Sequence, residues 1–153
     1  MSKQTKNKPK KEAQPRKTSL FRLYPTHKQE RKLDEWLALS CEVYNAALDE
    51  RQSAYRMAGV SLSSGHQCAE LPGCKEVRPE LDCVPSQVLQ DVVKRVDLAF
   101  AAFFQRVEEG QQPGSPRFTS RFRSHSLTFK QDGKSFNVLG SGKKNRGTLL
   151  LAK

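Results

Sequence analysis

A long apolar stripe in the second half of the chain constrains the fold more than any other feature of the sequence. Its side chains recur every three or four residues, which places them on one face of an α-helix. The stripe consists of Val88, Leu89, Val92, Val93, Val96, Phe100, Phe103, Phe104 and Val107. Pro85-Ser86 suits the start of this helix and Gly110 its end. A face this apolar must be buried, so it requires a partner of matching length.

A second helix, expected from Thr26 to about Met57, supplies that partner. Thr26 and Gln29 have the spacing of a capping box, and Gly59 is a typical terminator. Its apolar face, again at steps of three and four, consists of Leu33, Trp36, Leu37, Cys41, Tyr44, Ala47, Leu48 and Tyr55.

We expect the two long helices to pack antiparallel, with their apolar faces together. Phe103 or Phe104, or both, should then be buried against the side of the first helix that carries Trp36 and Tyr44. Trp36 and Tyr44 are interpreted as core residues rather than as ligand contacts.

The remaining elements are expected to be short. In the connector, residues 61–64 can start a helix that reaches Leu71, and Pro72-Gly73 should break it. Strands are expected over residues 20–25, 127–130, 135–139 and 148–151. Turns are expected at Asp132-Gly133 and around residues 140–142.

Positive charge is concentrated at the two ends of the chain. The net charge is +11: residues 1–19 carry +6, residues 115–153 carry +8, and the middle carries −3. Because Lys and Arg near phosphates release counterions, this distribution favours nucleic acid as the partner. A ribosome-like or merely soluble basic protein is the alternative. Residues 1–19 contain one aliphatic side chain and are predicted to be a disordered basic tail.

Basic and aromatic residues alternate after the second helix, between residues 117 and 130. Arginine binds phosphates with two hydrogen bonds, and aromatic rings can stack on unpaired bases. The segment therefore predicts contact with nucleic acid. The alternative is a surface hairpin whose Phe residues complete the core.

Several classes of protein are not expected. No stretch approaches ~18 consecutive apolar residues, and the N-terminus lacks the apolar centre of a signal peptide, so we expect a cytoplasmic protein with no membrane partner. Four reduced cysteines follow from that location. His66, Cys68, Cys74 and Cys83 could hold zinc, but their spacing is irregular and we expect no metal site. The motifs of the common hydrolases are absent, so no catalytic residue, cofactor or small-molecule substrate is expected.

Four stretches, in one order, resemble a known family. Residues 21–26 (FRLYPT) look like its opening F/Y-R-L-Y-P-T, and residues 41–48 (CEVYNAAL) like its V-Y-N-x-A-L helix. Residues 84–90 (VPSQVLQ) look like its V-P-S-Q-V-L-Q helix start, and residues 113–118 (PGSPRF) like its P-G-F-P-R-F exit. The family is the TnpB/OrfB proteins of small bacterial insertion sequences, which are RNA-guided nucleases.

The resemblance implies an α+β fold. An antiparallel helical recognition bundle of helix-turn-helix type, residues 26–112, would be inserted into a partial oligonucleotide-binding-like β-barrel. The barrel would consist of residues 20–25 and 113–153 and would be incomplete at the C-terminus.

The resemblance also implies a function. The RuvC-like nuclease domain of the family would lie beyond residue 153, so the chain is expected to be a truncated fragment that binds nucleic acid without cleavage and is not an enzyme. DNA is the expected partner, and a guide RNA is left open as a second one. The alternative is a domesticated DNA-binding regulator derived from such a transposase.

Candidate binding residues fall into two groups. Ser86, Gln87 and Gln90 lie at the start of the second helix, which in the resembled family helps to read a short motif beside the target. Lys130 and Gln131 are expected on a strand that faces this helix start. Ordinary capping by Ser86 and a solvated Gln pair are the alternative. The expected phosphate contacts are Arg117, Arg121, Arg123, Lys143, Lys144 and Arg146.

Overall fold

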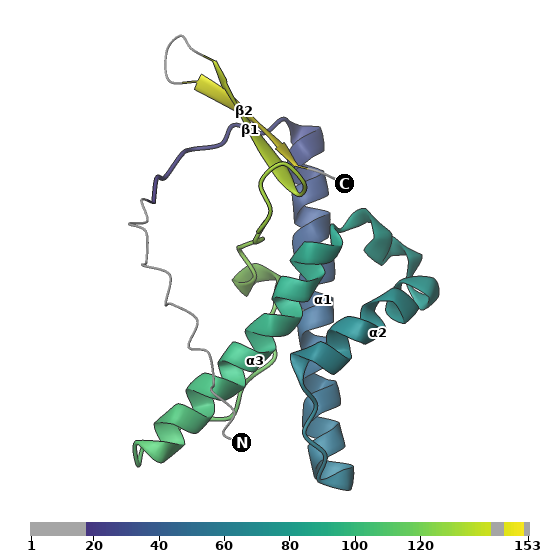
Figure 1. Cartoon of the computed structure of the whole chain (residues 1–153), viewed down its shortest axis with the longest axis vertical. Coiled ribbons are helices and arrows are strands. Elements are labelled where there is room, and N and C mark those ends of the chain that lie inside the picture. The colour runs from purple at the N-terminus through teal and green to yellow at the C-terminus, as the bar shows by residue number, and fades with distance from the viewer. Residues whose placement is uncertain (1–17, 142–145, 152–153) are drawn as a thin grey trace, which may run out of the picture.

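The computed structural model describes residues 18–141 and 146–151. The helical elements are α1 (His27–Ala58), α2 (Ser64–Val77), the 3₁₀ turn η1 (Pro79–Cys83), α3 (Ser86–Glu108) and the 3₁₀ turn η2 (Arg121–Arg123). The strands β1 (Phe136–Ser141) and β2 (Arg146–Leu151) follow them and form an antiparallel hairpin (Figure 1). At this level the expected α+β class is confirmed.

The ends of α1 are set by local signals that the sequence already contains. The backbone N–H of Thr26 donates to Oε1 of Gln29 at 2.8 Å, which closes the predicted capping box. Gly59 follows the last turn with a φ of 65°, in the left-handed region that favours glycine. Both predicted ends of this helix are confirmed to within one residue.

The connector between the two long helices is more helical than expected. Ser63 caps α2 by accepting a hydrogen bond from the backbone N–H of His66, but α2 continues through Pro72 to Val77. The predicted break at Pro72-Gly73 is therefore wrong. Leu71 is buried in the core while Pro72 and Gly73 are exposed, so packing on one face of α2 outweighs the backbone hydrogen bond that Pro72 cannot make.

The expected antiparallel arrangement of α1 and α3 is also wrong. One core cluster joins Trp36 and Leu39, early in α1, to Val88 and Leu89, early in α3. A second cluster joins Ala47 and Leu48 to Val96, later in both helices. The two long helices therefore run in the same direction, because α2 and η1 carry the chain back toward the N-terminal half of α1 before α3 begins (Figure 1).

The C-terminal third of the apolar stripe lies outside this core. Phe103 is half-buried and Phe104 is 56% exposed, and their rings contact each other with centroids 5.2 Å apart. The helices diverge toward their C-terminal ends (Figure 1), so α1 does not cover this part of α3. The prediction that one of these two rings is buried against Trp36 and Tyr44 is wrong.

The partial barrel is not confirmed. Residues 20–25 are extended but form no strand, and Leu20, Phe21 and Tyr24 are exposed. Residues 127–130 also form no strand, although Leu127 and Phe129 pack against the core. Among the described residues the sheet consists of β1 and β2 alone, with Phe136 opposite Leu151. A two-stranded hairpin cannot form a barrel, so the described residues do not contain the expected one.

The two predicted turns fare differently. The reversal at Asp132-Gly133 is confirmed, with Gly133 at a φ of 77°. Of the one around residues 140–142, residues 140 and 141 belong to β1 instead, and residue 142 lies outside the described residues. The disordered tail predicted for residues 1–19 lies almost wholly outside the described part of the chain.

Candidate nucleic-acid interface

A basic segment folds back along the α1–α3 pair. From the end of α3 the chain reverses and runs toward the hairpin (Figure 1). We call residues 116–130 the strap. It contains Arg117, Arg121, Arg123, His125 and Lys130 and no acidic residue.

Side chains of α1 hold the first half of the strap. The amide of Asn45 makes two hydrogen bonds with Thr119: its Nδ2 donates to the carbonyl oxygen, and its Oδ1 accepts from the backbone N–H, both at 2.9 Å. Two turns further along α1, Nε2 of Gln52 donates to the carbonyl oxygen of Pro116 at 3.1 Å. The strap backbone is therefore paired with helix side chains as it would be with a neighbouring strand.

Side chains of α3 hold the second half. The guanidinium of Arg95 donates to the carbonyl oxygen of Ser126 at 3.0 Å and to Oγ1 of Thr128 at 2.8 Å. Asp91 accepts from Nε of Arg95 at 3.1 Å and from Nζ of Lys130 at 2.5 Å. Arg95 and Asp91 thus join α3 to three positions of the strap.

The carboxyl group of Asp91 is stabilised in its charged form. Its burial raises the pKa, but hydrogen bonds from Lys130, Thr128 and Arg95 outweigh burial and hold the pKa below the ordinary value for aspartate. Lys130 therefore faces a carboxylate that remains charged at neutral pH, and much of its own charge is compensated within the chain.

The three arginine side chains of the strap point to solvent. Arg117, Arg121 and Arg123 are exposed, and none of them forms an ion pair with a described residue. The strap backbone is fixed while these guanidinium groups reach solvent. This is the arrangement that a surface for phosphate groups requires, since the positions of the charges are held without their being neutralised.

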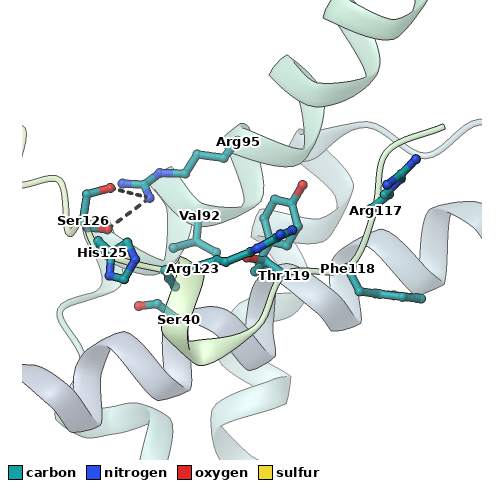
Figure 2. Close-up of a pocket in the computed structure, with 11 residues that line it drawn as sticks. Ser40, Val92, Arg95, Arg117, Phe118, Thr119, Arg123, His125 and Ser126 are labelled. Carbon is teal, nitrogen blue, oxygen red and sulfur yellow. Dashed lines mark hydrogen bonds between the residues drawn. The ribbon is translucent and has the colours of Figure 1, made fainter. Parts of the chain in front are cut away.

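A cavity of about 320 Å³ lies under the middle of the strap (Figure 2). Ser40 and Tyr44 of α1 line it together with Arg123 and His125 of the strap. Oγ of Ser40 is buried and has no hydrogen-bond partner among the described residues, and the side chain is 2% exposed. A hydroxyl donor without a partner, beside a free guanidinium, can bind an oxyanion such as a phosphate.

The predicted residues at the start of α3 lie where expected. Ser86 is the first residue of α3, and its Oγ accepts from Nζ of Lys75 at 3.2 Å rather than capping the helix. Gln90 is exposed, and Gln87 has a buried Oε1 that lacks a partner. The contact with Asp91 brings Lys130 beside this helix start, but Lys130 and Gln131 do not lie on a strand as predicted.

The other predicted site residues are placed as follows. Gln131 is exposed after Lys130, and its backbone begins the turn before β1. Arg146 starts β2. Lys143 and Lys144 lie outside the described residues. The structure therefore shows two groups, the outward arginines of the strap and the polar start of α3, with Lys130 between them.

Sequence reasoning missed the side chains that position the strap. Asn45 was quoted only as part of the V-Y-N-x-A-L motif, and Asp91 and Arg95 were not singled out. A polar amide between two apolar helix positions is a signal, because a side chain there must find a hydrogen-bond partner. The spacing of Asp91 and Arg95 by four residues is a second one.

Groups suited to metal binding do not gather in the part of the chain that is described. Residues 18–141 and 146–151 contain no group of three or more His, Cys, Asp or Glu side chains that could hold a metal ion. Burial raises the pKa of the Cys41, Cys68 and Cys83 thiols, which favours the protonated form that does not bind metals. Within the same residues no helix is long and apolar enough to cross a membrane.

Residues 16–59 match the family model of a helix-turn-helix domain, that of the OrfB proteins of IS605 type. All of α1 lies in the matched range, which ends at Gly59, and residues 60–63 and α2 follow it directly. No curated protein matches the chain. Over this range the chain is similar to the helix-turn-helix domain of an OrfB protein, which supports the OrfB part of the resemblance seen in the sequence.

Proposed function

We propose that this chain is a DNA-binding module related to OrfB transposases, and that the strap is its main contact surface. The observation that carries the proposal is the combination of a fixed backbone with free cations. Asn45, Gln52 and Arg95 hold the strap, while Arg117, Arg121 and Arg123 stay exposed and outside any described ion pair. The match of α1 to a helix-turn-helix domain supports the same class of partner.

One phosphate of the DNA backbone would enter the cavity beneath the strap. Arg123 and His125 would supply its positively polarised rim, and the free hydroxyl of Ser40 would donate from the floor. Such a contact fixes the register of the protein on the duplex without reading its sequence.

Selectivity for the DNA base sequence would come from the start of α3. Gln90 is exposed there, and an amide side chain can make two hydrogen bonds to the edge of adenine in the major groove. Lys130 contacts Asp91, which follows Gln90 in the sequence. A contact of Lys130 with the DNA backbone and a contact of Gln90 with a base would therefore be adjacent.

We further propose that the chain binds DNA without cutting it. The carboxylate that contacts the strap is engaged within the chain, since Asp91 pairs with Lys130 and Arg95. Cleavage assisted by two metals needs about three converging carboxylates that are free to bind them. Incubation of the chain with duplex and single-stranded DNA, in Mg²⁺ or Mn²⁺, should leave both intact. Cleavage that disappeared in an Asp or Glu variant of this chain would contradict this part of the proposal.

The binding proposal is tested by duplex affinity at one salt concentration. The triple variant Arg117→Ala, Arg121→Ala, Arg123→Ala should bind a duplex at least tenfold more weakly than the wild type. The charge-matched control replaces Lys28, Arg31 and Arg106, which are exposed on α1 and α3 and do not line the cavity beneath the strap, and should lose less. Equal losses in both variants would show that net charge, and not the strap, determines binding.

A further inference from the structure

A large open groove lies where α1 and α3 diverge. Its volume is about 1150 Å³, its surface is mainly apolar, and five of its lining residues are aromatic. The rings are those of Tyr55, Phe100, Phe103, Phe104 and Phe118. We call this the aromatic groove. It includes the end of the apolar stripe that the sequence led us to expect in the core.

The rings of the aromatic groove are unusually accessible for their type. Tyr55 is 66% exposed, Phe104 is 56% exposed and Phe118 is 55% exposed. Rings this large normally contribute to a core, and an apolar patch of neighbouring exposed rings marks a binding surface. No described segment covers them.

The charges at the groove identify the kind of occupant. Arg56 and Arg117 line it, and neither forms an ion pair with a described residue. The third lining arginine, Arg51, is paired with Asp97. None of the described lining residues is acidic. An occupant with flat apolar groups and negative charges fits this surface, whereas a second copy of the chain would bring two sets of arginines together.

We propose that the aromatic groove binds unpaired nucleotides of a single-stranded nucleic acid. Bases would stack on the exposed rings of Tyr55, Phe104 and Phe118, and Arg56 and Arg117 would contact the phosphates between them. This combination of stacking rings and a cationic rim is how proteins hold single strands without sequence preference. The inference rests on the proposed function in taking nucleic acid as the partner, and adds that part of this partner is unpaired.

The groove is continuous with the strap. Arg117 and Phe118 line both the aromatic groove and the cavity beneath the strap. In Figure 2 the side chains of Arg117 and Phe118 turn away from that cavity, at the end of the strap where the groove begins. A strand that leaves a duplex on the strap would therefore reach the rings directly.

The test compares unpaired and paired ligands on one pair of matched variants. Fluorescence anisotropy would measure the binding of labelled oligo-dT, oligo-U and a DNA duplex. The groove variant is Tyr55→Ala with Phe104→Ala. The control, Phe21→Ala with Tyr24→Ala, removes one Phe and one Tyr that are exposed but lie outside the groove. Because all four rings are exposed, thermal melting should show that both variants remain folded.

The groove variant should bind oligo-dT and oligo-U at least fivefold more weakly, while its duplex affinity and both affinities of the control stay within twofold of the wild type. Photo-crosslinking of an oligonucleotide with 5-iodouracil should label Tyr55, Phe104 or Phe118. Single-strand binding unchanged by the groove variant would overturn the inference, as would a dimer in sedimentation that this variant abolishes. If duplex binding depends on the strap arginines while single strands do not bind, only this inference fails. If no ligand binds the wild type, the proposed function fails as well.

Discussion

The side-chain amide of Asn45 pairs with both backbone polar groups of Thr119, at 2.9 Å in each direction. This contact joins residues 74 positions apart and ties the strap to the middle of α1. It gives the asparagine of the V-Y-N-x-A-L motif a structural role: it positions the basic segment that follows the P-G-x-P-R-F exit.

Replacing Asn45 should therefore loosen the strap. Asn45→Ala leaves the N–H of Thr119 without a partner and its carbonyl oxygen with only the thiol of Cys41, in a partly buried position, which should cost about 1–3 kcal/mol. Thermal melting would measure the loss, and hydrogen exchange should become faster at the amide of Thr119. The control is Asn137→Ala, on the exposed face of the hairpin. Equal exchange at Thr119 in the variant and the wild type would contradict the proposed anchor.

The contact between Asp91 and Lys130 should make the strap sensitive to acid. Since the folded pKa of Asp91 is below its unfolded value of about 3.9, its contribution to stability is fully present above that value and is lost as pH falls through the folded pKa. Asp91→Asn should remove this part of the acid dependence and lower stability at neutral pH. Melting between pH 7 and pH 2.5 would measure both effects, with Asp34→Asn on α1 as the exposed control. An unchanged pH profile would mean that the ion pair does not form.

The core and the aromatic groove should respond differently to truncation. Leu89 is fully buried between α1 and α3, so Leu89→Ala should cost about 2–5 kcal/mol. Phe104→Ala removes a larger side chain but an exposed one, and should cost less than about 1 kcal/mol. Chemical denaturation would measure both. A larger cost for Phe104 than for Leu89 would show that the helices pack as the sequence first suggested.

Replacing two glycines by alanine, Gly59 at the end of α1 and Gly73 within α2, should have opposite effects on stability. Gly73 is in a helix interior, and a Cβ added there meets open space, so Gly73→Ala should stabilise the chain by about 0.5–1 kcal/mol. Gly59 has a φ of 65°, so Gly59→Ala should destabilise it by about 1 kcal/mol. Thermal melting of the two variants would compare them. Stabilisation at Gly59 would contradict the left-handed end of α1.

The helices could be predicted from the sequence because their signals are local. Thr26, Gln29 and Gly59 act within one turn of the residues that they cap, and a period of three to four is visible without knowledge of the partner. The relative direction of α1 and α3 could not be predicted, because it depends on whether the residues between them form a third helix. There Pro72 suggested a break that the burial of Leu71 overrode.

The residue types of the candidate site could be predicted from the sequence, but the contacts that hold the strap on α1 and α3 could not. The alternation of Arg and Phe between residues 117 and 130 predicted contact with nucleic acid, and this stays a prediction; in the structure the arginines of the segment are exposed, while Phe129 packs against the core. What fixes that segment is a set of contacts to Asn45, Arg95 and Asp91, which are distant from it in sequence, and no local pattern indicates these pairings. Phe103 and Phe104 were assigned to the core because an apolar stripe does not show where its partner helix diverges.

The most direct test of the strap as the DNA-binding surface is the dependence of duplex binding on salt. Each phosphate contact contributes about −0.9 to the slope of log K against log salt concentration. The triple variant of Arg117, Arg121 and Arg123 should therefore show a slope shallower than that of the wild type by about 2–3. The charge-matched variant of Lys28, Arg31 and Arg106 should keep the slope of the wild type. A strap variant whose slope equals that of the wild type would contradict the central claim.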